Sequence, residues 1–306
     1  MKIIRAANEL KPGNRKVCLA IGFFDGVHLG HQQIIRQTIA DARQHDAIAV
    51  ALTFDRHPNS VVAPSRIPPL IYSLPQKLRA IESLGAEKIL LIQFDKRFSE
   101  QSGEEFIRSL SRDGGRIHGI CVGADFVFGH KRGGNVALLK KLGAELHFQV
   151  HGLAAVSLDG KVISSTRIRE AIRAGDLDGA SQMLGRPYAI CGAVVTGDKL
   201  GQQLGFPTAN LDATGLALPP NGVYSGRAKL EGKTYLVALN IGFRPTVTAG
   251  KALRVEAHLL DFDGELYGRE LEVEIGEKVR AEQKFDSVTE LKQQIARDIA
   301  RVRNSA

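Results

Sequence analysis

Tryptophan is absent from the sequence, and only 6% of its 306 residues are aromatic. So few aromatic side chains give little sign of a platform on which nucleic-acid bases could stack. Cysteine is also scarce: Cys18, Cys121 and Cys191 are the only three, and each lies in a run that we expect to form a strand. An odd number of cysteines in buried strands favours reduced thiols acting as small core residues, and therefore a cytoplasmic protein.

Long apolar runs are missing as well. No run approaches the roughly 20 apolar residues that a membrane-spanning helix needs, so we expect no membrane partner. The first residues, Met1–Arg5, lack the apolar core and cleavage site of a signal peptide, and we expect none. With 43% hydrophobic and 24% charged residues, the composition is that of a globular protein. Its 306 residues are enough for two domains.

The net charge of +8 allows two kinds of partner. One is a nucleic acid, and the other is a small molecule rich in phosphate. Because the basic residues are spread along the chain rather than gathered in a block, we favour small anionic ligands and expect no nucleic-acid partner.

A glycine-rich turn, Gly22–His31, follows a strand-like run, Val17–Ile21, and precedes a helical pattern that includes Ile34 and Ala42. Glycines let a backbone approach a ligand closely. The free N–H groups and partial positive charge at the start of a helix attract anions. The sequence therefore predicts an anion site at this turn.

His28 and His31 give the turn the HxGH pattern of enzymes that transfer a nucleotidyl group. Such enzymes hold the triphosphate and stabilise charge as pyrophosphate leaves. Two other interpretations stay open for this pair. The histidines could be zinc ligands, although no further Cys or His cluster has metal spacing, or they could be surface residues that cap a helix.

Strand-like and helical runs alternate through the first half of the chain, which predicts a Rossmann-like, doubly wound α/β domain with an open parallel sheet. The expected strands are Val17–Ile21, Ile48–Phe54, Ile89–Ile92, Ile117–Val122 and a weaker run at Leu146–Val150; the expected helices after the first are Pro75–Leu84, Gly103–Leu110 and Asn135–Leu142. Ligands bind such sheets beyond the carboxyl ends of the strands. Asp125 lies there, where it would orient a ligand or cap the turn.

The run Ser164–Arg169 combines hydroxyls with arginines at the expected start of a helix, where Ser165 or Thr166 would be the N-cap. Arg167 and Arg169 are unfavourable at the positive end of a helix unless an anion lies there. This local conflict predicts a second phosphate-binding segment.

The pattern changes after Gly185, so we expect one domain at residues 1–185 and another at residues 186–306. Short strands bounded by turn residues predict a small antiparallel barrel. These strands are Ile190–Thr196, Val223–Leu230, Tyr235–Ile241, Leu253–Leu260 and Leu271–Ile275. A final helix would pack on the barrel through an apolar stripe of Val288, Leu291, Ile295, Ile299 and Val302.

Two features of the second half carry the candidate chemistry. The loop Gly197–Asn210 can cradle phosphates through its backbone N–H groups, and Thr208 and Asn210 offer neutral oxygens suited to Mg²⁺; the alternative is an ordinary hairpin loop. In the alternating run Leu253–Leu259, Glu256 faces either solvent or a cleft. In a cleft, its carboxylate could take the proton from a hydroxyl that attacks ATP.

The chain resembles, over nearly its whole length, the bacterial bifunctional riboflavin kinase/FAD synthetases. The matching segments are Ile21–His31, Leu52–Pro58, Val122–Gly129, Ile163–Arg169, Leu184–Gly192, Leu204–Leu211, Gly222–Gly226, Asn240–Thr246, Val255–Phe262, Leu266–Gly268 and Val279–Phe285. The chain departs from the family pattern at Phe23, Val127, Thr196 and Gln202.

This resemblance implies two reactions that use ATP. The C-terminal domain would phosphorylate riboflavin to FMN with Mg²⁺, using Glu256 as the base and Thr208 and Asn210 as metal ligands. The N-terminal domain would adenylylate FMN to FAD, using His28 and His31. The remaining implied ligand-binding residues are Gly22, Phe23, Asp25, Gly30, Asp125, Phe128, Ser165, Thr166 and Arg167 in the first domain, and Gly197, Lys199, Gly205, Pro207 and Arg280 in the second.

The expected partners are riboflavin, FMN and ATP, and we expect a monomer or a weak homo-oligomer. Two other hypotheses remain open. One is an adenylyltransferase whose kinase domain is inactive, and the other is a flavin- or RNA-binding regulator, for which RNA binding would weaken steeply with salt.

Overall fold

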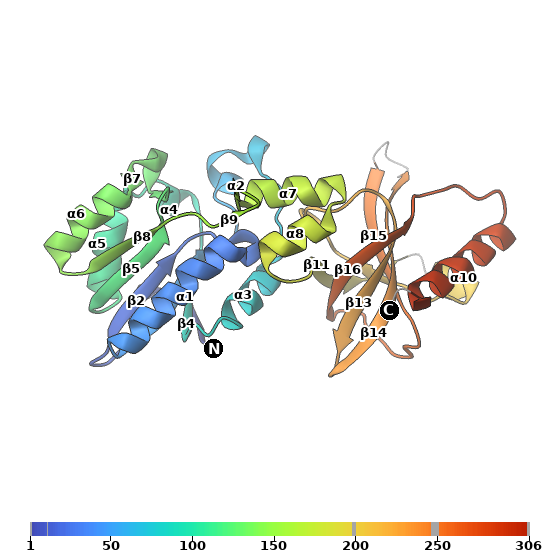
Figure 1. Cartoon of the computed structure of the whole chain (residues 1–306), viewed down its shortest axis with the longest axis horizontal. Coiled ribbons are helices and arrows are strands. Elements are labelled where there is room, and N and C mark those ends of the chain that lie inside the picture. Colours follow the sequence, from blue (N-terminus) through green and yellow to red (C-terminus); the bar gives the residue numbers. More distant parts are fainter. Residues whose placement is uncertain (1, 11, 198–199, 246–250, 305–306) are drawn as a thin grey trace. The chain divides into compact units, whose positions relative to one another are not determined.

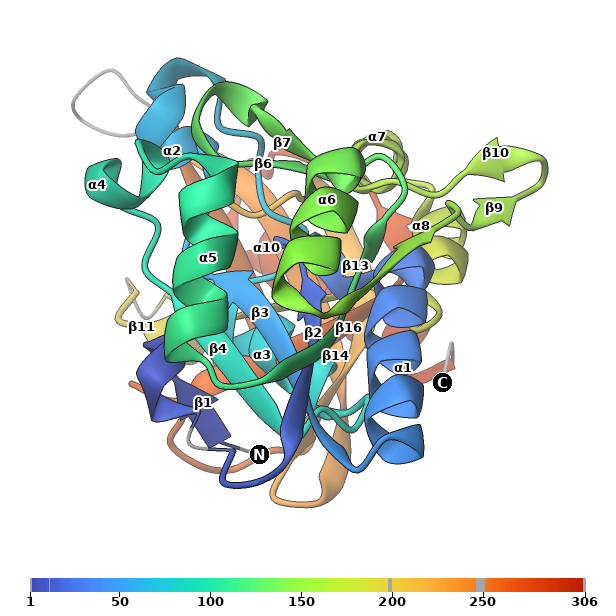
Figure 2. The ribbon, with the colours of Figure 1, turned by 90° about the vertical axis from the view of Figure 1, so that its left-hand side faces the viewer.

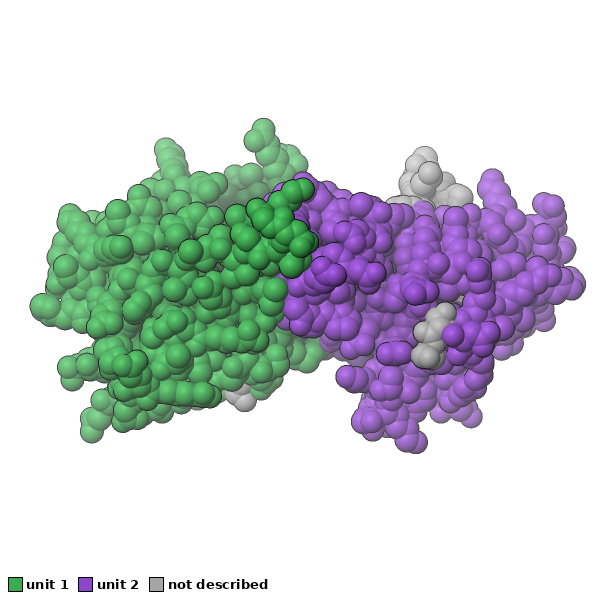
Figure 3. All heavy atoms as spheres, in the orientation of Figure 1, with its two compact units in different colours: residues 1–70, 74–165 green, residues 71–73, 166–306 purple. Residues whose placement is uncertain are grey.

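The computed structural model describes residues 2–10, 12–197, 200–245 and 251–304 of the chain. These residues form two compact units, which Figure 3 colours separately. The first unit consists of Met1–Leu70 and Leu74–Ser165, and the second of Ile71–Ser73 and Thr166–Ala306. The division into residues 1–185 and 186–306 stays a prediction.

The first unit is built on a six-stranded parallel sheet, which confirms the predicted fold class (Figure 1). Its order is β1-β4-β3-β2-β5-β8, with bounds Lys2–Ile4, Lys88–Ile92, Ala47–Phe54, Lys16–Ile21, Ile117–Gly123 and Gln149–Leu153. The edge strand β1 was not predicted, because three residues carry no periodicity. The weak strand expected at Leu146–Val150 lies later, because Leu146 completes a helix instead.

Helices cover both faces of this sheet, as a doubly wound domain requires. The apolar sides of α1 (Leu29–Gln44) and α3 (Leu74–Glu82) pack on one face. Those of α5 (Gly103–Asp113) and α6 (Val136–Leu146) pack on the other, in front of the sheet in Figure 2. Asn135 caps α6 by accepting from the Leu138 N–H. The carboxyl ends of the strands are thereby left uncovered by the main helices.

Shorter elements fill the connections of the first unit and lead into the second. They are η1 (Ala7–Glu9), η2 (Asp25–Val27), α2 (Asn59–Val62), η3 (Pro64–Arg66), α4 (Lys96–Ser99), β6 (Val127–Phe128), η4 (His130–Arg132), β7 (Gly134–Asn135), β9 (Ser157–Leu158), β10 (Lys161–Val162), α7 (Ser165–Ala174) and α8 (Leu177–Leu184). Because α7 begins at Ser165, Ser165 and Thr166 lie in its first turn rather than at the predicted N-cap position.

The three cysteines are free and buried, as the sequence predicted. Burial raises the pKa of Cys18 to about 11 and that of Cys121 to about 12. Both thiols are therefore protonated near neutral pH and act as core residues rather than nucleophiles.

The second unit contains a closed antiparallel barrel, again as predicted. Its order is β11-β12-β15-β14-β13-β16, with bounds Ala189–Val195, Ala209–Leu211, Lys251–Leu259, Lys233–Pro245, Gly222–Leu230 and Glu270–Arg280. The short strand β12 was not predicted as a strand, although it carries Asn210. It follows the short helix α9 (Leu200–Leu204) and closes the barrel between β11 and β15.

The C-terminal helix α10 (Val288–Asn304) packs against β13, β14 and β16 of the barrel. Val302 is buried, and the central members of the predicted stripe are half-buried, but Val288 is 62% exposed. The prediction that this stripe packs on the barrel is thus correct except for Val288, because the first turn of α10 extends beyond the barrel. No helix among the described residues combines the length and the apolar character needed to cross a bilayer.

Candidate active sites

The turn between β2 and α1 has an unusual backbone. Phe24 (φ 55°), Gly26 (φ 71°) and Val27 (φ 42°) all lie in the left-handed region, which a β-branched residue rarely enters. Glycine is required at position 22, because a Cβ there would lie 2.6 Å from the Phe24 ring. The direction of the N–H groups in this turn depends on an unfavourable backbone conformation. The surrounding residues must therefore hold that conformation in place.

The two histidines of the turn lie together. His28 is buried and caps α1, its Nδ1 accepting from the His31 N–H at 3.4 Å. The rings stack with centroids 3.6 Å apart. The helix-capping interpretation is thus correct for His28, but its side chain is 6% exposed and is not a surface residue. The described residues contain no group of three or more His, Cys, Asp or Glu arranged to hold a metal.

Burial, together with neighbouring His28 and Lys77, holds the pKa of His31 well below its ordinary value of 6.5. The ring is therefore neutral at pH 7, so it carries a single N–H donor and no fixed charge. Its Nδ1 atom is buried and has no hydrogen-bond partner. A buried polar atom without a partner is costly, so an approaching ligand can gain by satisfying it.

The predicted second phosphate-binding segment begins next to this turn. The Ser165 hydroxyl donates to the Asp25 carbonyl at 3.4 Å, across 140 positions of the sequence. Asp25 is itself buried. Thr166 and Arg167 belong to the second compact unit, so their approach to the turn stays a prediction.

Phenylalanines gather where β3, β4 and β5 end, although the sequence had shown few aromatics. Successive ring centroids along this row lie 5.2 to 6.4 Å apart. The row consists of Phe54, Phe94, Phe98, Phe106, Phe128 and Phe126. Phe126 and Phe128 stack nearly parallel, and exposed Asp125 precedes them. The predicted ligand residues Asp125 and Phe128 therefore lie at an apolar, aromatic edge of the sheet.

A second site lies on the outer wall of the barrel. Strand register places Asn210 opposite Glu256, and Glu256 opposite Asn240. The same row continues through Val223 to Arg280. Residues opposite one another in neighbouring strands share a face, so five strands contribute to one row. Asn240, which begins one of the matching segments but was given no role, donates to Glu256 at 3.4 Å.

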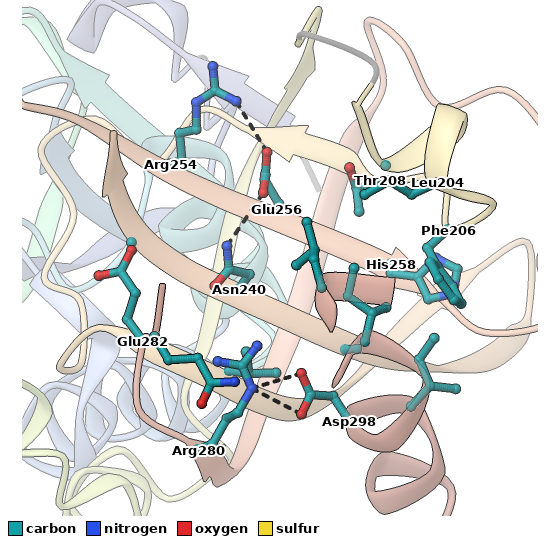
Figure 4. Close-up of a pocket in the computed structure, with 18 of the residues that line it drawn as sticks. Leu204, Phe206, Thr208, Asn240, Arg254, Glu256, His258, Arg280, Glu282 and Asp298 are labelled. Carbon is teal, nitrogen blue, oxygen red and sulfur yellow. Dashed lines mark hydrogen bonds and ion pairs between the residues drawn. The ribbon is translucent and has the colours of Figure 1, made fainter. Parts of the chain in front are cut away.

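This row lines a pocket of about 410 Å³ (Figure 4). Arg254, Glu256 and His258 all line it, while the intervening Val255 and Ala257 are buried in the barrel core. The cleft interpretation of the alternating strand is therefore correct. Apolar residues of α10 and the preceding loop complete the pocket: Phe285, Leu291, Ile295 and Ile299.

Arg280 forms an ion pair within this pocket. Its Nε lies 3.0 and 2.9 Å from the two carboxylate oxygens of Asp298 on α10. Asp298 is buried and also accepts from Gln294 at 2.9 Å. The ion pair thus joins the last barrel strand to the C-terminal helix in the pocket that Glu256 also lines.

The glycine-bearing loop lies next to a second pocket, of about 280 Å³. Pro207, Phe262 and Tyr267 line this one, whereas Thr208 and Asn210 line both pockets. A Cβ at Gly197 would lie 2.2 Å from Asn210 Nδ2, and Gly205 has φ 87°, so both positions need glycine. Lys199 lies outside the described residues.

Comparison with known proteins separates the same two parts. A family model described as FAD synthetase matches residues 10–167, and one described as riboflavin kinase matches residues 184–306. Curated relatives named bifunctional riboflavin kinase/FMN adenylyltransferase match nearly end to end. The Escherichia coli K12 protein is 38% identical over 97% of this chain and 96% of its own. The Pseudomonas fluorescens protein is 36% identical over 99% and 97%.

A solved structure also has the same fold throughout. The crystal structure of a protein described as a macrolide-efflux protein from Streptococcus pneumoniae matches with a TM-score of 0.83. It is 28% identical to this chain, and the match covers 99% of both chains.

Proposed function

The chain belongs to the family of bifunctional riboflavin kinase/FMN adenylyltransferases, and from this premise we propose how its residues divide the two reactions. It phosphorylates riboflavin to FMN and adenylylates FMN to FAD, with ATP as the co-substrate of both steps. The residue roles below are our proposal.

For the kinase step, the supporting observation is that Thr208 and Asn210 line two pockets at once. We assign the larger pocket, with Arg280 and α10, to the flavin, and the smaller one, with Phe262 and Tyr267, to ATP. The transferred phosphoryl group then passes between them. The Glu256 carboxylate takes the proton of the ribityl hydroxyl. At the same time the hydroxyl oxygen bonds to the γ-phosphorus of ATP, and ADP leaves.

Magnesium fits the residues between these pockets. Thr208 and Asn210 offer neutral oxygens, and close glycines leave room for both side chains: a Cβ at Gly201 would lie 3.1 Å from Thr208 Oγ1. Two protein oxygens suit an ion that keeps waters and binds substrate phosphates. When bound, Mg²⁺ would neutralise charge on the phosphates. We propose that the Gly197–Gly205 loop binds those phosphates, with Lys199 as one of the ligands that the family resemblance implies.

For the adenylylation step, we propose that ATP lies at the turn from Gly22 to His31. An oxygen of the FMN phosphate bonds to the α-phosphorus as the bond to pyrophosphate breaks. His28 and His31 stabilise the charge of the phosphates, and Ser165, Thr166 and Arg167 are proposed as further phosphate ligands. The aromatic edge that contains Phe128 suits an isoalloxazine ring, with Asp125 at its rim.

Partners and location complete the proposal. Phosphate-bearing substrates explain the net positive charge without a nucleic acid. We therefore propose riboflavin, FMN and ATP as the only partners. We also keep a monomer or weak homo-oligomer, which light scattering tests. The three free thiols support a cytoplasmic location.

The test supplies riboflavin or FMN separately, with ATP and Mg²⁺, and follows products by chromatography. We expect riboflavin to give FMN and then FAD, and FMN to give FAD directly. A chain with an inactive kinase would convert only FMN, and a binding regulator would return both flavins unchanged.

Replacing Glu256 tests its assigned role. Glu256→Gln should lower the kinase rate by about 10²–10⁴-fold, the usual contribution of a general base, and should leave FMN adenylylation intact. Glu277→Gln is the matched control, since Glu277 is exposed on β16 of the same barrel and does not line the pocket. Equal kinase rates in the two variants would exclude Glu256 as the base.

A further inference from the structure

Lys77, a residue of α3 that belongs to none of the motifs, lies under the strained turn of the adenylylation site. Its ammonium nitrogen donates to the Phe23 carbonyl at 3.2 Å, the Thr53 hydroxyl at 3.3 Å and the Phe54 carbonyl at 2.8 Å. The Thr53 hydroxyl in turn donates to the Phe23 carbonyl at 2.9 Å. One buried nitrogen thus joins the segment that follows β2 to the last two residues of β3.

These contacts match the donors of a protonated lysine. An ammonium group has three N–H donors, and Lys77 has three oxygen acceptors around it. Thr53 is fully buried and has one hydroxyl proton, so while it donates to Phe23 it accepts from Lys77. A neutral amine has only two N–H donors and could not make all three of these contacts as a donor.

The first of these acceptors, the Phe23 carbonyl, belongs to the residue that leads into the turn. Phe23 immediately precedes Phe24, the first of the left-handed residues. A strained backbone persists only where its surroundings fix it, and such strain is concentrated at functional sites. The Phe23 ring also lies under the ammonium, with the nitrogen 4.3 Å from its centroid. Lys77 therefore holds both the carbonyl and the ring of the residue that leads into the turn.

The charged and titratable groups around Lys77 come from every neighbouring element. Asp25 faces it from the turn, Asp55 from the segment after β3, and His31 from α1. His57 packs edge-on against the Phe23 ring. Burial lowers the pKa of Lys77 to about 8, and the two aspartates oppose that change. The ammonium form therefore dominates at pH 7 and is lost as the pH rises through about 8.

We propose that Lys77 is a positioning residue for FMN adenylylation: its buried ammonium fixes the Phe23 carbonyl, and thereby holds the turn in the conformation that aims His28, His31 and the backbone N–H groups at the phosphates. This inference rests on the proposed binding of ATP at that turn. Lys77 itself has no free donor left for substrate, so it acts through the turn.

Lys77→Met, made in the full chain, removes the charge and keeps the length of the side chain. We expect kcat for FMN adenylylation to fall by about 10²-fold, the effect of a small misplacement of reacting groups, with a smaller change in the KM for ATP. The riboflavin kinase rate should not change. Lys88→Met is the control, because Lys88 in the same unit also donates to a carbonyl, that of Leu10, away from the turn.

The pH profile separates this role from simple support of the fold. In the wild-type chain, adenylylation should fall as the pH rises through about 8. Lys77→Arg keeps its charge in this range and should lack that alkaline decline, while recovering part of the rate lost in Lys77→Met. Full adenylylation in Lys77→Met, or an unchanged alkaline decline in Lys77→Arg, would overturn the proposal.

Two further measurements keep the result decisive. If Lys77→Met does not fold, the profile of Lys77→Arg decides alone: a decline near the wild-type pH contradicts the proposal and its absence supports it. If His28→Ala adenylylates FMN normally, the assignment of ATP to the turn is wrong. Loss in His28→Ala with none in Lys77→Met would contradict only the role of Lys77.

Discussion

His28 contributes to the nucleotide turn both as the cap of α1 and as a neighbour of His31. We expect His28→Ala to lower FMN adenylylation by about 10²–10³-fold, as when a preorganised donor to a developing charge is lost. Steady-state rates with FMN and with riboflavin measure the two steps. His45→Ala, at the opposite end of the same helix, is the control. A similar loss in both steps would indicate misfolding instead.

Lys77 should affect stability with a pH dependence opposite in sign to its effect on activity. Its pKa is about 8 in the folded chain, against an ordinary value of 10.5. Between these values the unfolded chain binds a proton that the folded chain has lost, so the folded state gains stability as the pH rises. This gain is complete above 10.5 and is lost as the pH falls through about 8.

Urea unfolding of the wild-type chain and of Lys77→Met measures this effect. The difference in unfolding free energy should shift in favour of the wild-type chain between about pH 7 and about pH 10. A difference that stays constant over this range would show that Lys77 has an ordinary pKa in the folded chain.

At single residues, the sequence predicted the chemistry that motifs express locally. Glycine spacing and histidine identity pointed to the nucleotide turn, and strand alternation put Glu256 on one face with Arg254 and His258. Lys77 and Asn240 could not be found in this way, because their importance comes from partners far along the chain. A lysine on an amphipathic helix is usually solvated, and only the fold buries this one.

At the scale of elements, ion pairs of different burial link α10 to the rest of the second unit in the part of the chain that the structure describes. In Arg280–Asp298 the side chains are 17% and 5% exposed, and in Arg303–Asp261 they are 51% and 70% exposed. Asp298→Ala should cost about 3–5 kcal/mol, because it leaves a buried charge without its partner. Arg303→Ala should cost less than about 1 kcal/mol.

Denaturant unfolding of both variants checks this contrast. Riboflavin binding should weaken in Asp298→Ala as well, since α10 and Arg280 line the proposed flavin pocket. Equal, small losses of stability in the two variants would mean that the buried pair does not anchor the helix.

Element type was predictable where a run was long and periodic. The four main strands of the parallel sheet and the helices on both faces were predicted correctly. The short strands β1 and β12 were not, because each has three residues and forms only by pairing with distant partners. The strand predicted to begin at Leu146 begins at Gln149 instead. Leu146 completes α6, and Phe148 packs into the core before the strand starts.

At the scale of the whole molecule, the prediction concerns where the kinase part begins. Buried residues of α7 and α8 belong to the second compact unit, and the Tyr188 N–H donates to the Ser181 hydroxyl at 3.0 Å. A fragment of residues 166–306 should therefore be more stable than one of residues 186–306, by about 2 kcal/mol or more, the burial of one or two aliphatic side chains.

Thermal and urea unfolding of the two fragments tests this, with riboflavin phosphorylation as a check on the fold. We expect both fragments to phosphorylate riboflavin, because the barrel from β11 onward is complete in each. Equal stability would mean that α7 and α8 contribute little to the second unit, and would support a boundary at residues 185 and 186.

The most direct test of two separate ATP sites uses Glu256→Gln and His28→Ala together, with riboflavin, ATP and Mg²⁺. Alone, the first should leave riboflavin unchanged but convert FMN to FAD, and the second should accumulate FMN. Mixed, they should make FAD from riboflavin, because FMN released by one chain is used by the other. Loss of both steps in either single variant would contradict the account.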